Sequence, residues 1–244
     1  MSTAVRRRWA AKRGVLLGAC VAITVQVTAA AASMPLTSEH LTTTATCALV
    51  SYPATSSYSF DSFVDQNNAG ANSGTNNNLT LQSQPSKNRR VYIRFDLTSC
   101  LYAVPSGAIV RSATLRLSEA GALPAVCRTY DVFRNTSGPW TESGVTWTNQ
   151  PAGTTVNQPP TAQRTSSQDV GTPTACANHT GTAYVAWDVK ADVAAFLAGT
   201  ATNYGWMLRD DTEDSGTTYK VNFSARDQAN LALAPQLLVT YTLV

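Results

Sequence analysis

The stretch Arg90-Val-Tyr-Ile-Arg-Phe-Asp96 alternates apolar and polar residues with a period of two. One face of such a strand carries three apolar side chains, those of Val91, Ile93 and Phe95. The opposite face carries Arg90, Tyr92 and Arg94. This alternation is typical of antiparallel sheets, which bury one face and leave the other polar. The stretch therefore predicts a β-protein.

Similar runs recur along the chain between turn signals, which is the pattern of a β-sandwich or barrel. The predicted strands are 59–64, 79–83, 90–96, 109–117, 129–135, 184–189, 205–210, 219–225 and 236–242. One helix is predicted from the helical spacing of Val189, Val193, Phe196 and Leu197 before Gly199. Because no second strand–helix repeat accompanies it, a parallel α/β sheet is not expected.

The N-terminal segment accounts for the basic charge of the chain. Five of the 18 basic residues and none of the 15 acidic ones lie in residues 1–32. The remainder has 13 basic against 15 acidic residues, a net charge of −2, so nucleic acid is not an expected partner.

Residues 1–32 have the pattern of a secretory signal: a basic start, an apolar run from Val15 to Val27, and small residues at 30–32. A membrane anchor and a lipoprotein modified at Cys20 are the alternatives. We expect a secreted, extracellular protein that has no membrane segment after cleavage. No later stretch is apolar enough to span a bilayer.

Secretion would place the cysteines in an oxidising compartment, where they form disulfides. Removal of Cys20 with the signal leaves four, an even number suited to two disulfides in an oxidising compartment. Four cysteines allow three pairings, of which we favour Cys127–Cys176 with Cys47–Cys100.

The mature chain is expected to begin with a flexible lead-in rich in Thr and Ser at 33–57, followed by one domain at 58–244. The Thr/Pro/Gln stretch 149–182 is longer than an ordinary loop and is expected to form mostly surface structure.

Several short motifs follow one another in a recognisable order. They are Asp61-Ser-Phe-Val-Asp65, Asn78-Leu-Thr-Leu81, Arg90-Val-Tyr-Ile-Arg-Phe-Asp-Leu97, Val110-Arg-Ser-Ala-Thr-Leu-Arg-Leu117, Tyr130-Asp-Val-Phe-Arg134, Trp140-Thr-Glu-Ser-Gly-Val-Thr-Trp147, Trp187-Asp-Val189, Tyr204-Gly-Trp-Met-Leu-Arg209, Phe223-Ser-Ala-Arg226 and Pro235-Gln-Leu-Leu-Val-Thr-Tyr241. In order and spacing they resemble the DNRLRE domain, also described as carbohydrate-binding module family 96, over roughly 58–243.

The resemblance implies an all-β, jelly-roll-like antiparallel β-sandwich, here with one short helix, and similarity to modules that bind alginate. Such domains are usually appended to bacterial or archaeal surface proteins and polysaccharide-degrading enzymes. The four cysteines and the long 149–182 stretch depart from the family pattern. No catalytic domain accompanies the module in this chain.

A sugar-binding face needs aromatic rings and planar hydrogen-bonding groups, and arginine binds the carboxylate of a uronate through two hydrogen bonds. The candidate carbohydrate-binding residues are Arg90, Tyr92, Arg94, Arg116, Trp140 and Lys220. The alternative is that arginines such as Arg94 and Arg226 form internal ion pairs. Trp147, Trp187 and Trp206 are expected in the core, and Trp140 partly exposed.

The acidic run at 210–214 is the candidate metal site, because calcium takes six to eight oxygen ligands. Its candidate ligands are Asp210, Asp211, Glu213 and Asp214. A solvated acidic turn is the alternative. No other cofactor is expected.

The sequence thus predicts a monomeric, non-catalytic module that binds an extracellular polysaccharide, which could contain uronates. A structural or adhesive cell-surface protein is the alternative of another class, and a small lyase or hydrolase is the third. No nucleophile elbow, zinc-protease motif or phosphate loop occurs in the chain.

Overall fold

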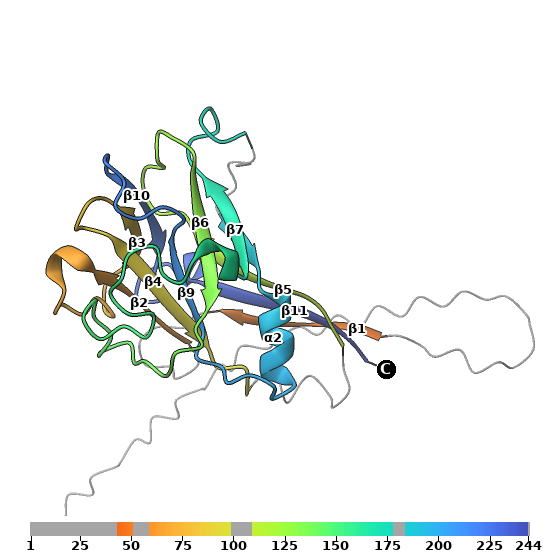
Figure 1. Cartoon of the computed structure of the whole chain (residues 1–244). Helices are drawn as coiled ribbons and strands as arrows, with labels where there is room; N and C mark the ends of the chain where they lie inside the picture. The colour runs from red at the N-terminus through yellow and green to blue at the C-terminus, as the bar shows by residue number, and fades with distance from the viewer. Residues whose placement is uncertain (1–42, 51–58, 99–108, 178–183, 244) are drawn as a thin grey trace, which may run out of the picture.

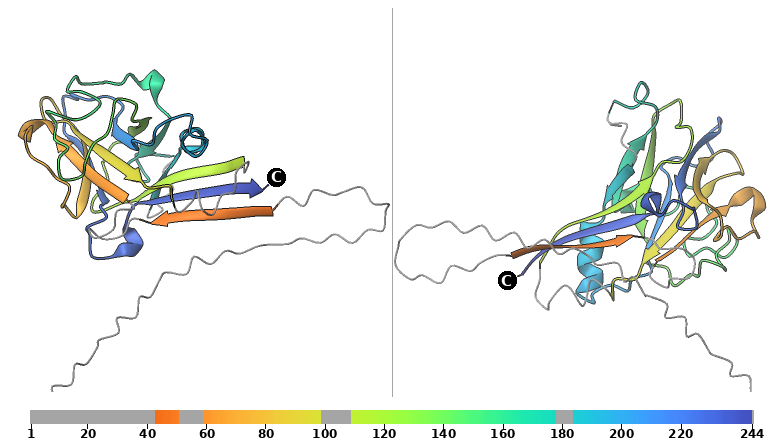
Figure 2. Two further views of the ribbon diagram at one scale, coloured as in Figure 1. Left: turned by 90° about the horizontal axis from the view of Figure 1, so that it is seen from below. Right: turned by 180° about the vertical axis from the view of Figure 1, so that it is seen from behind.

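The computed structural model describes residues 43–50, 59–98, 109–177 and 184–243. The predicted signal segment lies outside these residues. Within them the strands form two antiparallel sheets that face each other, as Figure 2 shows from below. The predicted all-β sandwich is therefore confirmed.

The first sheet has the strand order β1-β11-β5-β8. Its strands are β1 (Thr43–Val50), β11 (Gln236–Leu243), β5 (Ile109–Ser118) and β8 (Tyr184–Asp188). The second sheet has the order β10-β3-β4-β9-β6-β7, and β2 pairs with β4 beside this path. Its strands are β2 (Ser59–Asp65), β3 (Asn78–Ser83), β4 (Arg89–Phe95), β6 (Arg128–Arg134), β7 (Ser166–Val170), β9 (Trp206–Asp210) and β10 (Tyr219–Ser224).

The main core lies between the sheets and follows the alternation seen in the sequence. Strand β4 contributes Val91, Ile93 and Phe95, which are at most 1% exposed. Leu115 and Val239 face them from the first sheet and are fully buried. Burial of side chains of this size stabilises the fold by roughly 1.5–3 kcal/mol each.

The outer face of the second sheet is covered as well. A second apolar cluster lies there under the long loop that follows β6, drawn in green in Figure 1. It contains Val64, Tyr92, Phe133, Trp140, Val145, Trp147 and Met207. The predicted binding residues Arg90 and Tyr92 lie on this covered face and are therefore buried.

All nine predicted strands are present, with ends within one residue of the prediction. Two further strands were not predicted. The lead-in expected to be flexible contains β1, which pairs with β11 along its whole length. Its inward side chains include Ala45 and Cys47, and its exposed ones are those of Thr46 and Ala48, so the apolar contrast between the two faces is small. The stretch expected to be surface structure contains β7, which pairs with β6 but buries only Val170.

The predicted helix is α2 (Lys190–Leu197), which packs beside β5 at one end of the sandwich (Figure 1). Val193 and Phe196 are its apolar buried residues. The chain leaves it through Gly199, whose φ of +69° is favourable for glycine. Three single-turn 3-10 helices lie in loops: η1 (Gln66–Asn68), η2 (Thr161–Gln163) and η3 (Leu231–Leu233). Of the helices in the described ranges, none has both the length and the apolar character needed to cross a bilayer.

The predicted disulfide Cys127–Cys176 is present, with the two Cα atoms 4.8 Å apart. It joins the start of β6 to the loop after β7. The second predicted pair, Cys47–Cys100, stays a prediction because Cys100 lies outside the described residues.

Candidate functional site

Arg90 is fully buried, contrary to the exposure predicted for a binding residue. Nε and Nη2 donate to the two carboxylate oxygens of Glu213 at 2.7 and 2.8 Å. Nη1 donates to Gln150 Oε1 at 3.3 Å and to the Gly153 carbonyl at 2.9 Å. Nη2 also donates to the Thr155 carbonyl at 2.7 Å, so all five donors of the guanidinium are used. Arg90 therefore fastens the loop to the sheet and offers nothing to a ligand.

Tyr92 is also fully buried under the same loop. Its hydroxyl donates to Gln150 Oε1 at 3.0 Å and accepts from the Ala152 N–H at 3.3 Å. Burial raises the pKa of this phenol. Trp140 is 6% exposed, packs edge-on against Tyr92, and donates from Nε1 to the Tyr204 carbonyl at 2.9 Å. The predictions of an exposed Arg90 and Tyr92 and a partly exposed Trp140 are therefore wrong, because the loop covers them.

The other predicted binding residues do not form one surface. Arg94 lies over the ring of Phe60 at 4.4 Å, and burial lowers its pKa. Arg116 belongs to the opposite sheet, where it lies 5.0 Å from the ring centroid of Tyr184. Lys220 is exposed on β10, which β3 separates from β4. Neither Arg116 nor Lys220 therefore extends a face shared with Arg90. The expected core positions of Trp147, Trp187 and Trp206 are confirmed.

The acidic run 210–214 serves internal contacts. Asp210 accepts from Arg128 Nε at 3.0 Å, while burial raises its pKa to about 6. Glu213 binds Arg90, and Asp214 accepts from Asn88 Nδ2 at 2.5 Å. Asp211 is 3.9 Å from Arg128. Arginine and amide donors thus already occupy three of the four carboxylates predicted to bind calcium, those of Asp210, Glu213 and Asp214.

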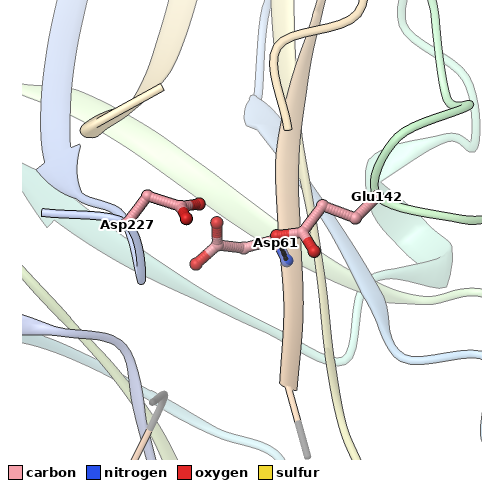
Figure 3. A group of neighbouring side chains, drawn as sticks. All are labelled: Asp61, Glu142 and Asp227. Carbon is pink, nitrogen blue, oxygen red and sulfur yellow. Dashed lines mark hydrogen bonds between the residues drawn. The ribbon is translucent and has the colours of Figure 1, made fainter. Parts of the chain in front are cut away.

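A different acidic group does come together. Asp61, Glu142 and Asp227 each offer a carboxylate oxygen within 4.8 Å of the others, the one such group found in the described ranges (Figure 3). Burial, opposed by a hydrogen bond from the Arg226 N–H, raises the pKa of Asp61 to about 8. Burial also raises the pKa of Glu142 to about 7, against the attraction of Arg226. These acids come from β2 and two loops.

A cavity of about 460 Å³ opens between the end of β6, the turn after η2 and the start of α2. It is lined by Phe133, Arg134, Thr136, Pro159, Gln163, Arg164, Thr165, Ala191 and Asp192. The side chains of Arg134 and Arg164 are 36% and 44% exposed. The volume lies within the range of small-ligand sites, roughly 300–1,000 Å³, and six of the nine lining residues are polar or charged.

The two cavity arginines are anchored more loosely than the buried ones. Arg134 Nη1 lies 3.5 Å from Asp192 Oδ1, and Arg164 Nε lies 3.7 Å from Asp131 Oδ1. Neither guanidinium makes a hydrogen bond to another described residue, whereas all donors of Arg90 are used. Asp192 is itself held by Thr165 Oγ1 at 2.6 Å. The carboxylates therefore position the two arginines without using up their donors.

The sequence did not single out this pair of arginines. Arg134 ends a predicted strand, and Arg164 lies 30 residues later in the stretch expected to be surface structure. Their meeting depends on β7, which holds the second segment beside β6. Because β7 has no apolar alternation, the sequence carried no signal for this juxtaposition.

The chain was compared with known proteins and with models of protein families. The curated proteins contain no match to the chain. The sequence model of carbohydrate-binding module family 96 matches residues 52–241, which include both cavity arginines and every strand except β1 and the end of β11. The chain belongs to carbohydrate-binding module family 96.

Proposed function

We propose that the protein is a secreted, non-catalytic module that binds an extracellular polysaccharide in the cavity between Arg134 and Arg164. Family membership supports carbohydrate binding in general. The observation that carries the choice of site is the pair of partly exposed guanidinium groups beside a cavity of about 460 Å³. The predicted signal segment at 1–32 supports secretion.

The chemistry of the cavity favours an acidic sugar. A guanidinium donates two parallel hydrogen bonds to a carboxylate, and these are stronger than bonds between neutral groups. Gln163 and Thr136 add a planar amide and a hydroxyl, which suit sugar hydroxyls. A uronate-containing polysaccharide is therefore the proposed ligand. Binding it involves no cleavage of a covalent bond.

Overall charge does not assist this ligand. The chain without residues 1–32 has a net charge of −2, so a polyanion meets weak overall repulsion. Attraction has to come from local cations, and Arg134 and Arg164 supply two of them at one place.

The test is affinity electrophoresis and calorimetry with alginate, polygalacturonate and a neutral glucan. The secreted form should bind at least one uronate polymer and lose tenfold or more of its affinity in Arg134→Ala and Arg164→Ala. Lys220→Ala is the matched control, because Lys220 is exposed on β10 and does not line the cavity.

Full binding by both arginine variants, with loss in Lys220→Ala, would move the site to the β10 surface. No retardation by any of the polymers would remove the proposed ligand class. Retardation by the neutral glucan alone would keep carbohydrate binding and reject the uronate.

A further inference from the structure

We propose that Asp61, Glu142 and Asp227 bind one calcium ion, which joins β2 to the loops after β6 and β10. The three carboxylates come from segments far apart in the sequence and meet at the edge of the second sheet. Figure 3 shows the carboxylates of Asp61 and Asp227 directed toward each other, with Glu142 reaching in from the far side of β2. This site is independent of the proposed glycan cavity.

The spacing of the oxygens suits calcium. One oxygen from each residue lies within 4.8 Å of the other two. Oxygens bound to one calcium ion at 2.3–2.6 Å are at most about 5 Å apart. Each pair of these oxygens is therefore close enough to be shared by a single ion.

The charges call for a divalent cation. When all three carboxylates are ionised they contribute −3, and Arg226 contributes +1 through its contact with Glu142 at 2.6 Å. The remaining −2 equals the charge that one calcium ion neutralises. A buried charge that is not balanced in this way is costly, because burial removes its hydration.

A buried hydroxyl without a partner lies on the same face of β2 as Asp61. Ser59 is 1% exposed, and its Oγ makes no hydrogen bond among the described residues. It lies two residues before Asp61 in β2, so both side chains project from the same face of the strand. The Arg226 guanidinium donates to the Ser59 carbonyl, and the Arg226 N–H donates to Asp61 at 2.9 Å, which brings both β2 residues to the same loop. A buried hydroxyl oxygen is a suitable further ligand for a hard cation.

Besides the Ser59 hydroxyl, one carboxylate oxygen of Asp227 has no hydrogen bond among the described residues. Its Oδ2 is buried and lies 3.9 Å from Arg226 Nε, which is too far for a hydrogen bond. The side chains of Asp227 and Glu142 are each 13% exposed, so water can complete the coordination of the ion. Protein oxygens and water together can reach the six to eight ligands that calcium takes.

The experiment uses the secreted form after removal of metals with EDTA. Calcium is added with calorimetric detection, and thermal unfolding is followed with calcium, with magnesium and with EDTA. We expect one calcium ion per chain and a melting temperature raised by several degrees in calcium over EDTA. Asp227→Asn should bind calcium at least tenfold more weakly and lose most of the calcium-dependent rise.

Asp214→Asn is the matched control, because Asp214 belongs to the acidic run 210–214 and not to this group. Asp61→Asn is a second test variant, and its melting temperature in EDTA is compared with that of the wild type in EDTA. Equal values would show that the variant folds normally, so that a loss of calcium binding comes from the missing ligand. Absence of calcium binding to the wild type at millimolar concentration would overturn the proposal. Wild-type binding by Asp227→Asn would do the same, as would loss of binding in Asp214→Asn alone.

Discussion

Arg90 was predicted as a ligand-binding residue because a polar face on a strand usually meets solvent. The parity of that prediction is confirmed, since Val91 and Ile93 enter the main core and Arg90 points the other way. What the alternation could not reveal is that a loop 60 residues later covers the polar face. Its Gln150 accepts from both Arg90 and Tyr92. A strand pattern reports which side is apolar, but it does not report what lies over the other side.

We expect Arg90→Met to lower the free energy of unfolding by about 3–5 kcal/mol, because it leaves the fully buried Glu213 carboxylate without its partner. The double variant Arg90→Met/Glu213→Leu should be destabilised less than Arg90→Met alone, since it removes both charges. Urea unfolding of the wild type, the two single variants and the double variant measures the coupling.

The matched control is Arg89→Met, because the Arg89 side chain is 27% exposed in its pair with Asp65, and it should cost about 1 kcal/mol or less. An Arg90→Met variant as stable as the wild type would show that this buried pair does not fasten the loop.

At the scale of elements, nine strands and the helix could be predicted because each contains apolar residues at the period of its structure. Strands β1 and β7 could not, for a shared physical reason. In β7 only Val170 is buried, and the inner face of β1 carries small side chains, those of the buried Cys47 and the half-buried Ala45. Both strands are held by backbone pairing to a neighbour, which leaves little trace in side-chain pattern.

The unpredicted strand β7 is the main reason that the cavity with Arg134 and Arg164 was not predicted. It carries the chain past η2 and places Arg164 beside the end of β6. Arg90 and Tyr92 lie on the strand face predicted for them, but a loop covers that face. The candidate glycan cavity could not be predicted from the sequence, because its residues meet only through pairings that involve a strand of polar residues.

The disulfide Cys127–Cys176 is expected to stabilise this same part of the fold. It closes a loop with a sequence separation of 49 residues that contains β6 and β7. Closing a loop of this length restricts the unfolded chain, so Cys127→Ser/Cys176→Ser should lower the free energy of unfolding by about 2–4 kcal/mol. Denaturant unfolding of the oxidised wild type and the double variant checks this expectation.

The control is reduction of both proteins: the reduced wild type and the reduced double variant should unfold at the same denaturant concentration. An unchanged midpoint in the double variant would show that strand pairing alone holds this region.

At the scale of the whole molecule, the question is where the folded domain begins. The prediction placed its start at residue 58, and the family match begins at residue 52. The structure adds β1, which lies before both and forms an edge of the first sheet next to β11. Its Cys47 is 7% exposed and belongs to the main core cluster, with Leu49 packed against it. Figure 1 shows β1 lying along β11, which is a central strand of its sheet only while β1 is present.

We therefore expect a chain that begins at residue 59 to melt roughly 5–10 °C below a chain that begins at residue 33. Removal of β1 exposes apolar surface on β11 worth about 2–4 kcal/mol and leaves the backbone groups of an inner strand unpaired. Thermal unfolding of the two chains under the same oxidising conditions measures the difference. Cys47→Ser in the longer chain separates the loss of a cysteine from the loss of the strand, and it should account for only part of the decrease. Equal melting temperatures for the two chains would place the start of the domain after β1, where the family match has it, and would reduce β1 to a dispensable edge.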